Sequence, residues 1–329
     1  MTMPTLREYF APSADGQDFA GVRRIPIRTA KGTFSVWTKR VGNNPRKKVL
    51  LLHGGPGGGH EFLEPLEPWL GAEGVEYYHY DQLGSAFSDQ PDDPDLWTME
   101  RFVDEVEQVR VALGLTRDNF YLFGTSWGGM LGIEYALAHG ENLKGLIVAN
   151  STSSIPASNR YSSEVLARQM DPVAVAEIRA LEQAGRFADP RYMEILFPHY
   201  LAVYMCRLPV WPDGLNRALL RWNRRVREVV FGLGMLTLAG RLAGWDRSAD
   251  LHRIDVPALF MGSTFDAFDP RHARWMSTQV KHGSYHHCAN GSHCAQWDDQ
   301  AAFAQGLLTF LEAVDQGKKA VRYESAANP

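Results

Sequence analysis

The chain has 329 residues, 45% of them hydrophobic and 22% charged, which is enough for one large globular domain or a core with an insertion. Its net charge is −4 (34 Lys and Arg against 38 Asp and Glu), so the chain lacks the excess of basic residues that is typical of nucleic-acid-binding proteins. Its three cysteines are too few for a disulfide framework. No segment is apolar enough to span a bilayer, so we expect a cytoplasmic protein with neither nucleic acid nor membrane as a partner.

Short apolar runs alternate with helical patterns in the first part of the chain. Residues 22–28 and 33–39 alternate between apolar and polar side chains, which predicts a pair of antiparallel strands. Residues 48–52 are almost continuously apolar, as in a parallel strand covered on both faces, and residues 76–80 predict a further strand. Thr98 is expected to cap a helix whose apolar side chains share one face.

The same alternation continues on both sides of a long segment without strand patterns. Strands are predicted at residues 119–123, 145–149, 256–261 and 284–288, and a last amphipathic helix at residues 303–314. Strands and helices in alternation predict an α/β protein with a mostly parallel central sheet and helices on both faces.

The segment without strands, residues 151–250, is rich in aromatic side chains. We predict that it is a helical cap inserted into a core made of residues 1–150 and 251–329. The chain beyond residue 316 is expected to be a polar tail. Five arginines in the second half of the cap are expected to form a solvated helix face: Arg217, Arg221, Arg224, Arg225 and Arg227.

Residues 124–128 (Gly-Thr-Ser-Trp-Gly) stand between a predicted strand and a predicted helix. G-x-S-x-G in this context is typical of a nucleophile elbow, a turn so tight that small residues must flank the serine. The alternative is a plain glycine turn. We predict that Ser126 is a nucleophile whose hydroxyl projects beyond the sheet.

A serine hydroxyl needs a base, and the base needs a carboxylate to orient it. In the α/β-hydrolase arrangement the chain order is Ser, Asp or Glu, then His, each following a strand. Asp266 follows the predicted strand at 256–261, with Asp269 as its competitor, and His293 follows the strand at 284–288. We predict Asp266 and His293. The competing histidines lie in or before that last strand: His282, His286 and His287.

Histidines and cysteines cluster near the end of the chain and invite a metal-site interpretation. Adjacent His286 and His287 would point to opposite faces of a strand, and there is no C-x-x-C pair. We therefore expect no metal. The residues considered are His286, His287, Cys288, His293 and Cys294.

A tetrahedral intermediate needs two backbone N–H donors for its oxyanion. One is expected from Trp127, directly after the nucleophile, and the other from the glycine-rich residues 53–57 (HGGPG), with Gly55 as the predicted donor. A phosphate-binding loop is the alternative for residues 53–57, but no G-K-[ST] follows.

Together these motifs resemble those of the proline iminopeptidases, α/β-hydrolases with a helical cap. The resemblance implies a serine exopeptidase without cofactor that releases an N-terminal proline or small apolar residue from a short peptide or similar small molecule. It also implies that Ser126, Asp266 and His293 form the triad and that Gly55 and Trp127 form the oxyanion hole. The resemblance extends from about Ile25 to Leu311 and rests on residues 53–57 (HGGPG), 81–85 (DQLGS), 124–129 (GTSWGG), 262–266 (GSTFD) and 291–293 (GSH).

One position departs from the family pattern. Met235 stands where family members usually carry a glutamate that holds the substrate's free amine, and a thioether cannot pair with an ammonium. Nearby acids that could substitute for it are Glu194, Asp213 and Glu228.

Three functions compete at this stage. The first is the aminopeptidase, and the second is a hydrolase of uncharged esters, amides or lactones on the same triad, which Met235 favours. The third is a catalytically silent binding protein, against which the complete Ser126, Asp266 and His293 set argues. A dehalogenase or epoxide hydrolase would need a carboxylate at position 126.

Overall fold

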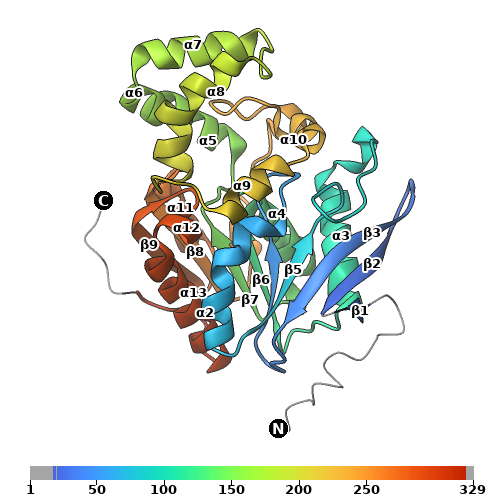
Figure 1. Cartoon of the computed structure of the whole chain (residues 1–329). Helices are drawn as coiled ribbons and strands as arrows, with labels where there is room; N and C mark the ends of the chain where they lie inside the picture. The colour runs from blue at the N-terminus through green and yellow to red at the C-terminus, as the bar shows by residue number, and fades with distance from the viewer. Residues whose placement is uncertain (1–17, 20, 324–329) are drawn as a thin grey trace.

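The computed structural model describes residues 18–19 and 21–323, and a nine-stranded sheet runs through these residues (Figure 1). Its strand order is β1-β2-β3-β5-β4-β6-β7-β8-β9. The strands are β1 (Asp18–Phe19), β2 (Val22–Thr29), β3 (Gly32–Val41), β4 (Lys48–Leu52), β5 (Glu76–Asp81), β6 (Phe120–Thr125), β7 (Gly145–Ala149), β8 (Ala258–Phe265) and β9 (Gly283–Ser292).

The sheet is mostly parallel, as predicted. The strands β1, β2, β3 and β5 pair in antiparallel fashion, whereas every pairing from β5 through β4, β6, β7 and β8 to β9 is parallel. The predicted strands are confirmed, with shifted ends: β6 covers 120–125 instead of 119–123, β8 covers 258–265 instead of 256–261, and β9 continues to Ser292 instead of ending at 288. The extension of β9 has no apolar pattern from which it could be predicted. It is a strand because Ser292 pairs with Phe265 of β8, beyond an irregularity between Ser263 and Phe265.

Helices cover both faces of the sheet because the side chains of each central strand alternate between them. On β4, Leu50 and Leu52 pack with α3, α4 and α11, whereas Val49 and Leu51 pack with α2 and α13. The oxygen of Thr98 accepts a hydrogen bond from the Arg101 N–H and caps α3, as predicted. The helices of the core are α2 (Glu67–Ala72), α3 (Met99–Ala112), α4 (Trp127–His139), α11 (Pro270–Gln279), α12 (Ala295–Asp298) and α13 (Gln300–Asp315).

The chain between β7 and β8 contains helices and, within the described residues, no strand. Figure 1 shows most of these helices above the sheet. They have a hydrophobic cluster of their own, whose buried members lie between Leu166 and Leu236. The helices are α5 (Ile155–Tyr161), α6 (Ala167–Gln169), α7 (Pro172–Gln183), α8 (Pro190–Leu196) with a π-helical continuation (Phe197–Met205), α9 (Asp213–Leu220) and α10 (Arg224–Phe231).

The two ends of this segment meet. Ser154, just after β7, forms an isolated antiparallel bridge with Asp246, and its hydroxyl donates to the Asp246 carboxylate at 2.9 Å. The contact is consistent with an insertion that leaves and rejoins the core at one place. The boundaries at residues 151 and 250 stay a prediction.

One expectation about exposed regions is wrong. Arg227 is buried, at 6% exposed, because it lies on the face of α10 that also carries the buried Val226 and Val230, whereas the other four arginines are exposed. The segment after residue 316 is exposed as far as residue 320, but Val321 and Tyr323 pack against the core, where the Tyr323 hydroxyl donates to the Gly306 carbonyl at 2.7 Å. Residues 1–17, 20 and 324–329 lie outside the described residues.

We predict that Glu134→Ala lowers the free energy of unfolding by about 2 to 3 kcal/mol, because a buried acceptor shared by two donors is lost. Glu134 on α4 accepts from the Trp245 indole and from the Arg247 guanidinium at 2.7 Å, and so fixes the cap's exit to the core. Urea denaturation is the measurement. Glu134→Gln keeps one acceptor oxygen and should lose less; equal losses in the two variants would contradict this account.

Candidate active site

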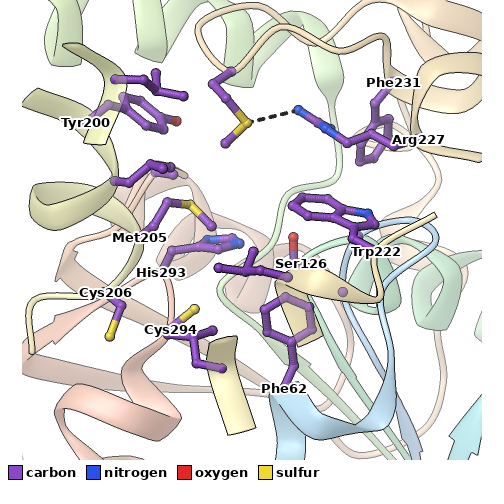
Figure 2. A pocket seen from close by; sticks show the side chains of 18 of the residues that line it. Phe62, Ser126, Tyr200, Met205, Cys206, Trp222, Arg227, Phe231, His293 and Cys294 are labelled. Atoms are coloured by element: carbon purple, nitrogen blue, oxygen red, sulfur yellow. Dashed lines mark hydrogen bonds between the residues drawn. The ribbon is translucent and has the colours of Figure 1, made fainter. Parts of the chain in front are cut away.

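Ser126 lies on a strained turn between β6 and α4. Its φ is 55° and its ψ −122°, a conformation that costs free energy for any residue with a side chain. The turn needs glycine on both sides: a Cβ on Gly124 would lie 2.0 Å from the Gly128 carbonyl oxygen, and one on Gly128 would lie 2.3 Å from the Leu52 carbonyl oxygen. Figure 2 shows the Ser126 hydroxyl pointing into a cavity, as the elbow motif predicts.

His293 and Asp266 meet at the same edge of the sheet. Asp266 follows β8, His293 follows β9, and His293 Nδ1 lies 2.7 Å from Asp266 Oδ1. With Nδ1 facing the carboxylate, Nε2 is the ring nitrogen left to face the cavity, which both His293 and Ser126 line. The structure therefore joins His293 to Asp266 and places Ser126 on the cavity that His293 also lines.

Asn150 is a residue of the site that the sequence analysis missed. Its Nδ2 donates to Asp266 Oδ2 at 2.8 Å, and the Phe268 N–H donates to Asp266 Oδ1 at 3.0 Å, so donors hold both carboxylate oxygens. Asn150 has a φ of 46°, a region that asparagine tolerates better than most residues. The sequence feature that could have identified Asn150 is its position directly after a predicted buried strand.

The competing residues have other partners. Asp269 caps α11 by accepting from the Arg271 N–H at 2.9 Å, and His282 lies 3.4 Å from Asp255. His286 contacts the Ala302 carbonyl at 2.8 Å. The hydroxyls of Thr264 and Tyr285 each lie 2.9 Å from a nitrogen of His287. In the described part of the chain, no three His, Cys, Asp or Glu side chains are grouped so as to hold a metal ion.

The glycine-rich loop after β4 lies against the elbow. A Cβ on Gly54 would lie 3.2 Å from the Ser126 Cβ and 3.7 Å from its Oγ. His53 holds this loop, since its Nδ1 contacts the Gly54 carbonyl at 2.7 Å and its Nε2 accepts from the Gln82 N–H at 3.1 Å. Complete burial lowers the pKa of His53, which favours the neutral imidazole that these two contacts require.

Gln82 connects the predicted oxyanion elements. Its amide nitrogen donates to the His53 carbonyl at 3.3 Å, and its amide oxygen accepts from the Trp127 indole at 2.8 Å. One side chain thus holds the loop that carries Gly55 and the first residue of α4 at a fixed separation. The neighbouring Asp81 accepts from the His60 N–H at 2.8 Å and so closes the far end of the loop.

The comparisons with known proteins agree with this architecture. Residues 47–300 match the family model described as alpha/beta hydrolase fold. A proline iminopeptidase of Flavobacterium johnsoniae is 50% identical over 294 residues, covering 89% of this chain and 99% of the relative. One of Elizabethkingia meningoseptica is 51% identical over 294 residues, covering 88% and 98%. The chain belongs to the proline iminopeptidase family of α/β-hydrolases. In a solved structure titled "Crystal structure of VinJ", which is 26% identical, 88% of this chain matches 98% of that chain with a TM-score of 0.82.

The cavity that Ser126 lines measures about 570 Å³, and both the core and the cap line it. Ser126 and His293 lie at its base, and Tyr200 and Arg227 of the cap lie opposite (Figure 2). Most of the lining is aromatic or aliphatic. No aspartate or glutamate of the described chain is among the lining residues, where the charged groups are Arg224 and Arg227.

Met235 lines the cavity, as expected of a residue that contacts the substrate, but the three acids considered as substitutes for a glutamate do not. Glu194 is exposed and 3.6 Å from Arg191, and Glu228 is paired with Arg225 at 2.9 Å. Asp213 is exposed at the start of α9. The idea that one of them holds an amine in this cavity is therefore wrong.

None of the helices described here combines the length and the apolar composition that crossing a membrane would require.

We predict that Asn150→Ala lowers kcat about tenfold with little change in KM, because Asp266 loses a charged hydrogen bond that fixes its orientation toward His293. Steady-state kinetics on the purified variant is the measurement. Asn44→Ala, which removes an asparagine bonded to the Gly74 carbonyl and not among the cavity's lining residues, is the control for an amide loss away from the carboxylate. A fall in KM alone, or an unchanged kcat, would contradict this role for Asn150.

Proposed function

We propose that the protein is a serine hydrolase that acts through an acyl-enzyme, with Ser126 as nucleophile, His293 as base and Asp266 as the orienting carboxylate. The observation that carries this proposal is the 2.7 Å contact between His293 Nδ1 and Asp266 Oδ1 at the base of a cavity that Ser126 also lines. This is the arrangement that activates a serine hydroxyl near neutral pH.

The reaction follows from these positions. Ser126 Oγ attacks the scissile carbonyl carbon while His293 Nε2 takes its proton, and Asp266 stabilises the imidazolium. The N–H groups of Gly55 and Trp127 would donate to the oxyanion. The tetrahedral intermediate collapses as His293 gives the proton to the leaving amine. Water then attacks the acyl-enzyme by the same route, which releases the acid and restores the serine.

The substrate class rests on the relatives and on the cavity. The relatives' name, proline iminopeptidase, together with the apolar lining, supports release of an N-terminal proline or small apolar residue from a short peptide. The second candidate is hydrolysis of uncharged esters, amides or lactones. It is favoured by the lack of a carboxylate among the described lining residues. The three cysteines are free thiols, which supports a reducing compartment, and we propose the cytoplasm.

We predict that Ser126→Ala loses about a thousandfold or more of kcat/KM on any hydrolysed substrate, because removing a triad member leaves only binding and oxyanion stabilisation. An organofluorophosphonate should label the wild type at Ser126, found by peptide mass spectrometry. Ser163→Ala changes an exposed serine of the cap and is the control. Labelling of another serine, or wild-type turnover by Ser126→Ala, would refute the assignment.

We predict that kcat/KM falls as the solution is acidified, because protonated His293 cannot accept the serine proton. The measurement is a pH–rate profile, with circular dichroism at each pH to show that the fold persists. A rate that stays constant down to about pH 5 in folded protein would exclude a histidine base.

A further inference from the structure

Three large apolar side chains that the described chain exposes to solvent lie at the mouth of the cavity. Met193 is 48% exposed, Phe197 is 42% exposed and Leu220 is 86% exposed, and all three line the cavity that Ser126 also lines. Met193 belongs to α8, Phe197 to its π-helical continuation and Leu220 to the end of α9. Exposed apolar side chains that gather around one opening are typical of a binding surface, whereas scattered ones are not.

A continuous apolar wall connects this opening to the proposed base. The ring centre of Phe197 lies 5.1 Å from that of Trp211, whose indole donates to the Cys206 carbonyl at 3.1 Å. The preceding carbonyl, of Met205, accepts from the N–H of the residue after His293 at 2.8 Å. We call the six cavity-lining side chains of this series the apolar wall: Met193, Phe197, Met205, Cys206, Trp211 and Leu220.

The apolar wall stands on the His293 side of the nucleophile. Figure 2 shows Met205 beside His293 on one side of Ser126, and Trp222 on the other side. The Trp222 indole donates to the Pro56 carbonyl at 2.6 Å, in the glycine-rich loop that carries the predicted oxyanion donor. The cavity therefore has a histidine side and an oxyanion side.

These two sides match the two directions in which a substrate extends from Ser126. In the tetrahedral intermediate the oxyanion points toward its N–H donors, and the leaving nitrogen points toward the histidine that protonates it. That nitrogen must come within about 3 Å of His293 Nε2. The groups that follow it in the leaving part then extend along the apolar wall. A cavity of about 570 Å³ is of the size that holds a drug-sized ligand, so it has room for more than one proline or alanine.

We propose that the apolar wall binds the first residue of the leaving part and selects peptides whose second residue is large and apolar. Contact with the wall removes apolar surface of both partners from water, which is favourable. The wall contains no charged side chain, so a polar second residue would lose water there without gaining a charged partner. This inference rests on the proposed function, because it assigns a peptide class to the same Ser126 site.

The test compares three dipeptide amides: prolyl-leucinamide, prolyl-asparaginamide and prolyl-phenylalaninamide. Leucine and asparagine side chains are similar in size and differ in polarity, and the C-terminal amide removes a charge that the lining Arg224 could bind. All three form the same prolyl acyl-enzyme, so differences in kcat/KM come from the leaving part alone. We expect kcat/KM for the leucine compound, measured from released proline, to exceed that for the asparagine compound by about tenfold. The phenylalanine compound should at least equal the leucine compound.

Variants of the wall locate the effect. Trp211→Ala and Phe197→Ala should each lower the leucine-to-asparagine ratio by about threefold to tenfold, whereas Trp211→Phe should keep most of it because an aromatic ring remains. Leu220→Asn should lower the ratio in the same direction. Val210→Asn is the matched control: Val210 is 81% exposed in the same stretch of chain and does not line the cavity, so the ratio should not change. The ratio is taken within one protein, so it does not depend on how much of a variant is folded.

Other outcomes would overturn the proposal. If the three peptides are cleaved equally well, this inference fails and the proposed function stands. A leucine preference that survives all the wall variants, or that Val210→Asn lowers as much as they do, would place the second residue on another surface. If no peptide is cleaved but a fluorophosphonate labels Ser126, the aminopeptidase and this inference fail together and the serine hydrolase stands. If Ser126 is not labelled either, the proposed function fails as well.

Discussion

The site depends on one strained turn, because everything else is arranged around the position that this turn gives to Ser126. A φ of 55° persists only where the surroundings enforce it. Here the Ser126 N–H donates to the Ala149 carbonyl at 3.0 Å, and the Ser151 hydroxyl donates to the Ser126 carbonyl at 2.7 Å. On the other side, Gly128 packs on the backbone of Leu52. The neighbouring strands β4 and β7 thus hold the turn, and the same strands lead into the loop of Gly55 and into Asn150.

The cap lines one side of the cavity, and hydrogen bonds also attach it to the residues around His293, directly after β9. The His293 N–H donates to the Tyr204 carbonyl at 2.9 Å, and the Cys294 N–H donates to the Met205 carbonyl at 2.8 Å. The Ser292 hydroxyl donates to the same Met205 carbonyl at 2.9 Å. These bonds join the π-helical end of α8 to the residue proposed as base. Cap and core therefore position His293 together.

The cavity combines the hydrolase architecture of the family with an unusual charge distribution. Its walls are aromatic and aliphatic, its base carries Ser126 and His293, and its buried charged group is the cation Arg227. Buried charges are retained where a partner or a ligand compensates their desolvation. The residues proposed for catalysis thus follow strands of the core, whereas Arg227 lies on α10 between β7 and β8.

Local patterns determined much of this protein. The strands, the tight turn at Ser126 and the polar residues Asp266 and His293 after β8 and β9 could be predicted, because alternation, glycine spacing and chain order express short-range sterics and strand ends. Only the tertiary structure decided which partners meet across the chain. Asn150 reaches Asp266 over 116 positions, Gln82 joins His53 to Trp127, and Arg227 turns inward although the other four arginines of its segment are exposed. Sequence spacing carries no record of such contacts, since they depend on how distant elements pack.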